Sequence, residues 1–317
     1  MDPIPLQYPF EDRISPFAES VEQHTRSWLY QGYRLIPPEI KKRYAHTKTG
    51  YLTARFFPLA TYERLLPLAM SSLWGLAFDD YYEHATPKTF SWLKDRIGTI
   101  IRGGSPRQGE NELFYEMKIM AEGFQKFMPG FWMDRFARSM ETYIDGMGEE
   151  APYKAKLCFP TLETYMDIRW RSVDVLQMID GLEVATEMPL PDEVRHHPLM
   201  EEITKVTCRI IAWCNDYFSY QKEAGRDVMN LVLVLQHETD CSLDKAVSEA
   251  VRIHDQDVSR YLTLKGSLPD FGKWQPAVKK FLAANELMIA GHWRWYITDT
   301  TRYQPGGSPD KDVFAVT

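Results

Sequence analysis

Three oxygen-bearing side chains recur at intervals of four residues in the stretch WCNDYFSYQKE at 213–223. An α-helix turns by about 100° per residue, so Asn215, Ser219 and Glu223 share one face, with Lys222 beside them. Amide, hydroxyl and carboxylate oxygens are hard ligands that suit Mg²⁺ better than zinc or copper. A neighbouring lysine suits an anion that the metal also holds. The spacing therefore predicts a magnesium site that binds an anion.

An exposed polar helix face would show the same spacing. The stretch is, however, flanked by the apolar runs IIAWC at 210–214 and VMNLVLVL at 228–235. Such runs indicate a helix that packs deeply in the fold. We therefore favour a buried site over a solvated face.

A second acidic group lies in WGLAFDDYYEH at 74–84. Asp79 and Glu83 are four residues apart and share a helix face, whereas Asp80 points about 100° away. Two carboxylates on one turn can bridge a divalent cation, and without one they repel each other. Acids at a helix end are often simply solvated. These acids end a largely apolar helix, which favours a position inside a cavity.

Helical periodicity dominates the rest of the chain. Apolar residues recur three and four apart at 60–84, 111–127, 131–150 and 274–303, and no stretch alternates as a strand. Short Pro/Gly-rich breaks separate about ten to twelve predicted helices, with no linker long enough to divide domains. The pattern predicts an all-α fold, with 1–317 as a single domain and with mobile segments at 1–14 and 304–317.

Composition narrows the functional classes. The chain has 317 residues, 44% of them hydrophobic, and a formal charge of −7, which argues against nucleic-acid binding. Four cysteines without a CxxC pair indicate reduced thiols and no zinc site. The proline-rich, acidic N-terminus does not resemble a signal peptide, and no apolar run approaches the roughly 20 residues of a membrane helix. We expect a cytoplasmic protein that does not bind membranes.

Together these segments resemble the bacterial class I terpene synthases, and the likeness covers nearly the whole chain. The segment 8–29 is similar to the family's N-terminal segment, and 54–83 to the helix that ends in its aspartate-rich motif. The segment 215–235 resembles the second metal motif, N(D)xxSxxxE, and TTRY at 300–303 resembles the C-terminal Arg-Tyr pair. The resemblance implies a helical bundle around a central cavity and a cyclase that acts on an isoprenyl diphosphate.

The resemblance also implies roles for particular residues. Three Mg²⁺ would be bound by Asp79, Glu83, Asn215, Ser219 and Glu223. Diphosphate contacts would come from Arg169, Lys222, Arg302 and Tyr303, while Asp80 would pair with Arg302. Arg169 lies 46 residues before Asn215, where the family has its diphosphate-sensing arginine, and Arg171 is the nearby competitor. Ser172 and Val173 stand where relatives often have a linker residue and a glycine at a helix break, with Asp174 next, and both are expected to line the substrate pocket.

Aromatic side chains near the motifs are candidates for the wall that faces a carbocation, because aromatic faces stabilise a cation without attacking it. The candidates are Phe56, Trp74, Phe78, Trp295 and Tyr296, and for each of them a place in the core is the alternative. Tyr296 stands where the family usually has a tryptophan, and Trp295 precedes it. On this interpretation Phe78→Ala changes the product mixture.

Two other functions are compatible with parts of the pattern. A chain-elongating prenyl transferase is one. The members of that family carry two aspartate-rich motifs, whereas the second motif here has Asn, Ser and Glu. A non-catalytic helical binding protein is the other. Among cyclase substrates, farnesyl diphosphate is favoured over geranylgeranyl diphosphate. Members of the terpene synthase family are often homodimers, which makes a homodimer one possible assembly, but the sequence does not determine the oligomeric state.

Overall fold

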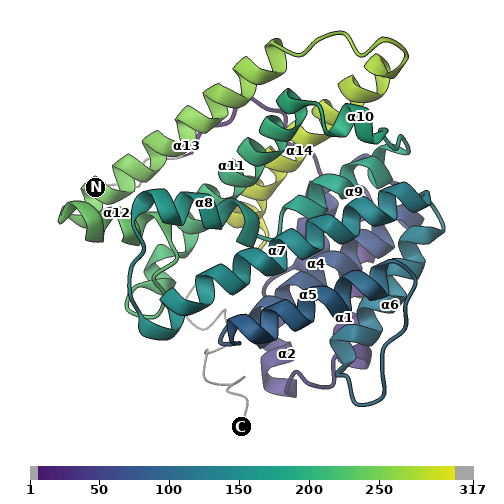
Figure 1. Ribbon diagram of the computed structural model, residues 1–317, viewed down its shortest axis with the longest axis horizontal. Coiled ribbons are helices and arrows are strands. Elements are labelled where there is room, and N and C mark those ends of the chain that lie inside the picture. The colour runs from purple at the N-terminus through teal and green to yellow at the C-terminus, as the bar shows by residue number, and fades with distance from the viewer. Residues whose placement is uncertain (1–5, 304–317) are drawn as a thin grey trace.

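The fold is a bundle of helices, and the computed structural model describes residues 6–303 (Figure 1). Within that part there are fourteen α-helices, one 3-10 helix and no strand, so the predicted all-α class is correct. The helices are α1 (Ala18–Gly32), α2 (Pro38–Tyr44), α3 (Thr49–Phe56), α4 (Tyr62–Tyr82), α5 (Pro87–Ile101), α6 (Glu112–Gln125), α7 (Gly130–Lys156), α8 (Leu162–Ser172), α9 (Leu176–Thr186), α10 (Asp192–Arg195), α11 (Pro198–Glu223), α12 (Leu231–Thr239), α13 (Leu243–Gly266), η1 (Gly272–Trp274) and α14 (Gln275–Thr298).

Long helices surround the centre of the bundle. α7 packs along α5 and α8, α11 packs along α13, and α14 packs against α3, α9 and α11. In Figure 1, α7 crosses the front of the molecule, while α13 runs along one outer edge. This arrangement brings the C-terminal end of α4 and the C-terminal half of α11, far apart in sequence, around the same central space.

Three non-helical residues, 173–175, interrupt the helical path between α8 and α9. Val173 caps the C-terminal end of α8. Asp174 has a φ of 62°, which lies in the left-handed region that residues other than glycine rarely adopt. Gly146 allows α7 to approach this break closely, because a Cβ at that position would lie 2.8 Å from the backbone nitrogen of Ser172. The break therefore falls directly after Ser172 and is fixed against α7.

Of the two end segments that we expect to be mobile, residues 1–5 and 304–317 lie outside the described residues. Within residues 6–14, part of the first of these segments, some side chains pack on the fold. Leu6 is buried, and the Tyr8 ring meets the His254 ring edge-on at 5.0 Å between centroids. None of the helices within residues 6–303 combines the length and the apolar character that crossing a membrane requires.

Candidate active site

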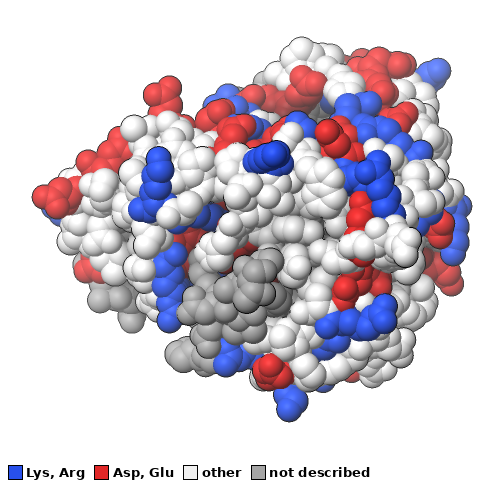
Figure 2. Space-filling model, turned by 60° about the horizontal axis from the view of Figure 1, so that its bottom comes forward, with Lys and Arg blue, Asp and Glu red and all other residues white. Residues whose placement is uncertain are grey.

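A cavity of about 910 Å³ opens in the middle of the bundle. Its lining comes from the loop after α2 and from α3, α4, α7, α8, the break after α8, α9, α11, the loop after α11, and α14 with the residues that follow it. One end is rich in charged groups and the other in apolar and aromatic ones. Figure 2 shows one face of the molecule, where acidic and basic side chains are interspersed around a hollow.

The end of α4 forms an acidic wall of this cavity, to which Asp79, Asp80 and Glu83 all contribute. Burial, together with the neighbouring carboxylates and against the opposite effect of Lys154, raises the pKa of Asp79 to about 6. Asp80 accepts hydrogen bonds from Arg302 Nη2 at 3.1 and 3.3 Å and one from the Tyr44 hydroxyl. Asp80 is thus paired with Arg302. Asp79 and Glu83 are the other two acids that this wall presents to the cavity.

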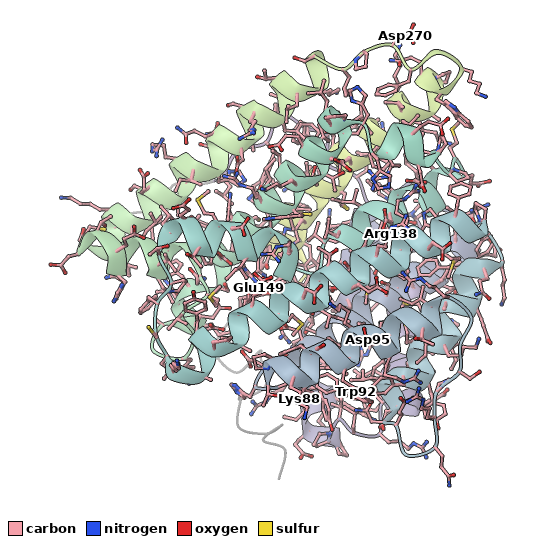
Figure 3. The ribbon with its side chains drawn as sticks, in the orientation of Figure 1. Lys88, Trp92, Asp95, Arg138, Glu149 and Asp270 are labelled. Atoms are coloured by element: carbon pink, nitrogen blue, oxygen red, sulfur yellow. The ribbon has the colours of Figure 1, made fainter. Side chains whose placement is uncertain are left out.

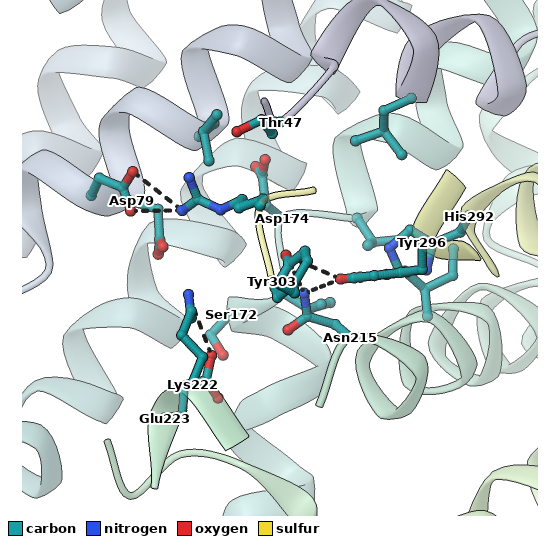
Figure 4. A pocket seen from close by; sticks show the side chains of 18 of the residues that line it. Thr47, Asp79, Ser172, Asp174, Asn215, Lys222, Glu223, His292, Tyr296 and Tyr303 are labelled. Carbon is teal, nitrogen blue, oxygen red and sulfur yellow. Dashed lines mark hydrogen bonds and ion pairs between the residues drawn. The ribbon is translucent and has the colours of Figure 1, made fainter. Parts of the chain in front are cut away.

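The polar stripe of α11 forms the facing wall. Asn215, Lys222 and Glu223 line the cavity, and Figure 4 shows them across it from Asp79. Asn215 Nδ2 donates to the Tyr296 hydroxyl at 2.6 Å, and the Lys222 ammonium lies 4.0 Å from Glu223 Oε1. The two predicted oxygen-rich walls therefore face the same space.

Ser219, the middle residue of the stripe, lies just behind the cavity surface. Its side chain is fully buried and does not line the cavity. Asn230 Nδ2 donates to Ser219 Oγ at 3.2 Å and to Glu223 Oε2 at 2.9 Å. Asn230 Oδ1 accepts the Val232 N–H at the start of α12, so its amide can present only its nitrogen to the stripe. Asn230 therefore holds two of the three stripe residues in register.

Arg169 joins the stripe to α8. Its guanidinium donates to Asp216 Oδ1 at 2.8 Å and to Asn215 Oδ1 at 2.9 Å. Burial raises the pKa of Asp216 to about 6, although the Arg169 charge lowers it. Arg171, the competing candidate, pairs instead with the half-exposed Glu149 at 2.6 Å, and Figure 3 labels Glu149 on α7. Of the two arginines, only Arg169 reaches the cavity.

Lys154, which no sequence pattern singled out, lines the cavity near the end of α7. Its ammonium lies 3.1 Å from Glu150 Oε2 and 3.8 Å from Asp227 Oδ2. Burial would lower the pKa of Lys154, but four surrounding carboxylates hold that pKa well above its ordinary value: Asp227, Glu150, Glu83 and Asp79. Lys154 thus supplies a positive charge among acids from the end of α4, from α7 and from the loop after α11.

The apolar end of the cavity contains most of the predicted pocket residues. Phe56, Val173, Trp295 and Tyr296 line it, and Ser172 lines the cavity at the helix break. Trp295 Nε1 donates to the Thr47 carbonyl at 3.0 Å, and the Tyr296 hydroxyl donates to Tyr303 at 3.1 Å. The Ser172 hydroxyl donates to Glu150.

The prediction that Trp74 and Phe78 line the pocket is wrong. Both rings are buried and stacked on each other at 4.5 Å, and Trp74 Nε1 donates to the Leu113 carbonyl, away from the cavity. The reason is the helix face, because positions 74 and 78 lie opposite Ser72, Leu76 and Asp79, which do line the cavity.

Phe78→Ala is therefore expected to act on stability. Phe78 has no exposed surface and also contacts the Tyr82 and Tyr143 rings, so truncation should lower the free energy of unfolding by about 3 to 5 kcal/mol. Urea titration of the wild type and the variant measures this difference. Phe131→Ala, at a residue that is 41% exposed, is the matched control, with an expected change below about 1 kcal/mol. A similar loss in both variants would contradict the placement of Phe78 in the core.

Comparisons with known proteins agree with this architecture. Residues 71–260 match the family model described as terpene synthase family 2, C-terminal metal binding. The (+)-T-muurolol synthase of Roseiflexus castenholzii, named as cyclizing (2E,6E)-farnesyl diphosphate, is 29% identical over 98% of this chain and 97% of its own length. The 10-epi-cubebol synthase of Sorangium cellulosum is 31% identical, with 85% and 88% of the two chains covered.

Solved structures show the same fold. The SVS_A2 protein from ancestral sequence reconstruction superposes with a TM-score of 0.82 at 25% identity and covers 93% of this chain and 90% of its own. The linalool/nerolidol synthase of Streptomyces clavuligerus superposes with a TM-score of 0.83 over 92% of this chain and 100% of its own, and at 17% identity it shows the fold alone. The chain therefore belongs to the terpene synthase family and is a class I terpene cyclase.

Proposed function

We propose that this cyclase ionises farnesyl diphosphate with the help of Mg²⁺ and closes the resulting cation to a cyclic terpene. The observation that carries the proposal is the cavity itself, in which two oxygen-rich walls face each other beside an apolar, aromatic chamber. The (+)-T-muurolol synthase and the 4-epi-cubebol synthase of Streptosporangium roseum are both named as cyclizing (2E,6E)-farnesyl diphosphate. This likeness supports farnesyl over geranylgeranyl diphosphate.

The metal ligands would be Asp79 and Glu83 on one wall and Asn215, Ser219 and Glu223 on the other. Their oxygens are of the kind that Mg²⁺ prefers. Among residues 6–303, no three His, Cys, Asp or Glu side chains are arranged to hold a metal ion by themselves. We propose that phosphate oxygens of the substrate would complete the ligand set of each Mg²⁺. Bound Mg²⁺ would supply Lewis acidity and positive charge to the leaving group.

We propose three ions, the number that the resemblance to class I terpene synthases implies. A diphosphate ester and the three carboxylates of Asp79, Glu83 and Glu223 together carry about −6, which three Mg²⁺ would neutralise. Unit charges 4 Å apart interact by about 4 kcal/mol at an effective dielectric of 20, so each missing ion would leave repulsions of that size.

Cationic side chains would hold the diphosphate from the other directions. Arg169, Lys222 and Arg302 all line the cavity, and Tyr303 adds a hydroxyl beside Asn215 at 3.4 Å. Arg302 is oriented by Asp80 and Arg169 by Asp216, so each guanidinium is positioned before substrate arrives. Such fixed donors stabilise the charge that develops on the leaving group without reorganising.

The apolar chamber would protect the cation. Phe56, Trp295 and Tyr296 present aromatic faces there, each worth about 0.5 to 2 kcal/mol to a nearby cation. Exclusion of water keeps the cation from being quenched before the rings close.

Incubation with farnesyl and with geranylgeranyl diphosphate, with Mg²⁺ or with EDTA, tests this function. We expect pyrophosphate release and a cyclic product, identified by gas chromatography with mass spectrometry, from farnesyl diphosphate and only with Mg²⁺. A longer diphosphate would instead identify a prenyl transferase, and no turnover of either substrate would indicate a binding protein. The homodimer and the cytoplasmic location stay predictions.

The apparent affinity for Mg²⁺ is expected to fall below about pH 6. Asp79 has a pKa raised to about 6, so the metal must displace a proton from this carboxyl at lower pH, at a cost of up to about tenfold in affinity per pH unit. The folding stability of the metal-free protein depends on pH with the opposite sign. Because the pKa of Asp79 is raised in the folded state, this group favours folding at low pH, and that contribution is lost as the pH rises to about 6. Mg²⁺ titrations between about pH 5 and pH 8, followed by pyrophosphate release, measure the effect. An apparent affinity that stays constant over this range would contradict it.

A further inference from the structure

One basic side chain lies among the aromatic groups of the apolar chamber. His292 lines the cavity from α14, one turn before Tyr296, and its residue is only 6% exposed. Its ring centroid lies 5.6 Å from that of Phe56, 6.2 Å from that of Trp295 and 5.0 Å from that of Tyr296. Figure 4 shows His292 on the opposite side of the cavity from Asp79.

The Nδ1 atom of His292 is buried and has no hydrogen-bond partner among residues 6–303. Leaving a buried polar atom unpaired costs about 1 to 3 kcal/mol, so the arrangement calls for an explanation. Burial lowers the pKa of His292 to about 3, so the ring is neutral and one nitrogen carries an unshared electron pair.

Three of the carboxylates that line the cavity already accept hydrogen bonds. Asp80 accepts from Arg302, and Glu223 accepts from Asn230 at the charged end. Asp174 accepts a hydrogen bond from Gln177, and burial together with the charge of Asp79 raises its pKa well above the ordinary value. In the aromatic chamber, His292 is the neutral base with an available electron pair.

We propose that His292 ends the carbocation cascade by accepting a proton, an inference that rests on the proposed function. In this step a C–H bond beside the cationic carbon breaks, its electron pair forms a C=C bond, and the proton binds the unprotonated ring nitrogen. The products are a neutral cyclic alkene and an imidazolium. The proton then passes to the diphosphate leaving group or to water as the cavity opens.

The surroundings of His292 suit this step. A carbocation makes its adjacent C–H bonds strongly acidic, so even a weakly basic imidazole can take the proton. The imidazolium that forms is stabilised by the neighbouring aromatic faces, by about 0.5 to 2 kcal/mol each. A fixed base also selects which proton is lost, because it reaches only the C–H bonds that the folded intermediate turns towards it.

The test compares the wild type with His292→Phe, which keeps an aromatic ring and removes both nitrogens. Both proteins are incubated with farnesyl diphosphate and Mg²⁺, and pyrophosphate and all terpene products are quantified. We expect the share of the wild-type main product to fall at least about fivefold, a loss of roughly 1 kcal/mol in selectivity. The new products should keep the same carbon skeleton, with the double bond moved or with a hydroxyl from water.

Three results would overturn the proposal. An unchanged product mixture would show that another group takes the proton, and new carbon skeletons would show that His292 only shapes the chamber. A wild-type product that retains every substrate hydrogen and gains a hydroxyl would remove the deprotonation step. If the wild type releases no pyrophosphate from farnesyl or geranylgeranyl diphosphate, the proposed function itself fails, which is a distinct outcome.

Thermal melting supplies a readout that does not depend on turnover. Replacing an unpaired buried imidazole by an apolar ring of similar shape should leave the melting temperature unchanged or raise it. A fall of more than about 5 °C would mean that His292 is retained for packing, which contradicts the proposal. If His292→Phe does not fold, His292→Gln, which keeps a polar group but is not a base, takes its place with the same expected products.

Discussion

Glu223→Gln is expected to reduce pyrophosphate release about a thousandfold. Glu223 lines the cavity and is aligned by Asn230 at 2.9 Å, and the substitution keeps its shape while removing one negative charge. The loss of one charge interaction of about 4 kcal/mol with a bound ion corresponds to about three powers of ten in rate. Initial rates of pyrophosphate release at saturating Mg²⁺ measure the effect.

Glu201→Gln is the matched control, because Glu201 lies on the same helix with its side chain 57% exposed. Its rate should stay within about threefold of the wild type, since exposed charges contribute little. Melting temperatures of both variants separate loss of chemistry from loss of structure. If Glu223→Gln kept its rate while remaining folded, Glu223 would not hold a catalytic ion.

Arg169→Met is expected to lower both the free energy of unfolding and the rate of pyrophosphate release. Arg169 pairs with the buried Asp216 at 2.8 Å, and removing one partner of a buried ion pair costs about 3 to 5 kcal/mol of unfolding free energy. The same change removes a donor from Asn215 and a cation from the cavity, so pyrophosphate release should fall at least about a hundredfold. Urea titration and initial rates measure the two effects.

The comparison with Arg171→Met is direct, since the two arginines lie two residues apart on α8. Arg171 pairs with the half-exposed Glu149, so its loss should cost less than about 1 kcal/mol and change the rate less than about threefold. If Arg171→Met lost more activity than Arg169→Met, the assignment of the two arginines would have to be reversed.

The motif side chains could be placed from the sequence because helical periodicity fixes which residues share a face. Asp79 with Glu83, and Asn215 with Glu223, lie where a rotation of about 100° per residue puts them. For Trp74 and Phe78, residue type and nearness to Asp79 in the sequence favour the pocket, whereas the same rule favours the core. Both positions lie opposite Asp79 on the helix, and the core is where the structure has them.

Other parts of the site depend on contacts between distant segments, which no local pattern reveals. Lys154 forms an i,i+4 pair with Glu150, a spacing that in sequence is typical of an exposed helix face, yet it lies among buried carboxylates. Asn230 could be recognised as a helix cap before an apolar run, but its contact with Ser219 requires the turn after α11. His292 has no sequence signal beyond its type, and only its aromatic surroundings distinguish it.

The most direct test of the two facing metal-binding walls is an anomalous difference map from crystals grown with Mn²⁺ and pyrophosphate. We predict strong peaks within about 2.0 to 2.3 Å of carboxylate oxygens of Asp79 and of the oxygens of Asn215, Ser219 and Glu223, with pyrophosphate between them. Peaks elsewhere, or pyrophosphate bound without any metal contact to these residues, would contradict the account.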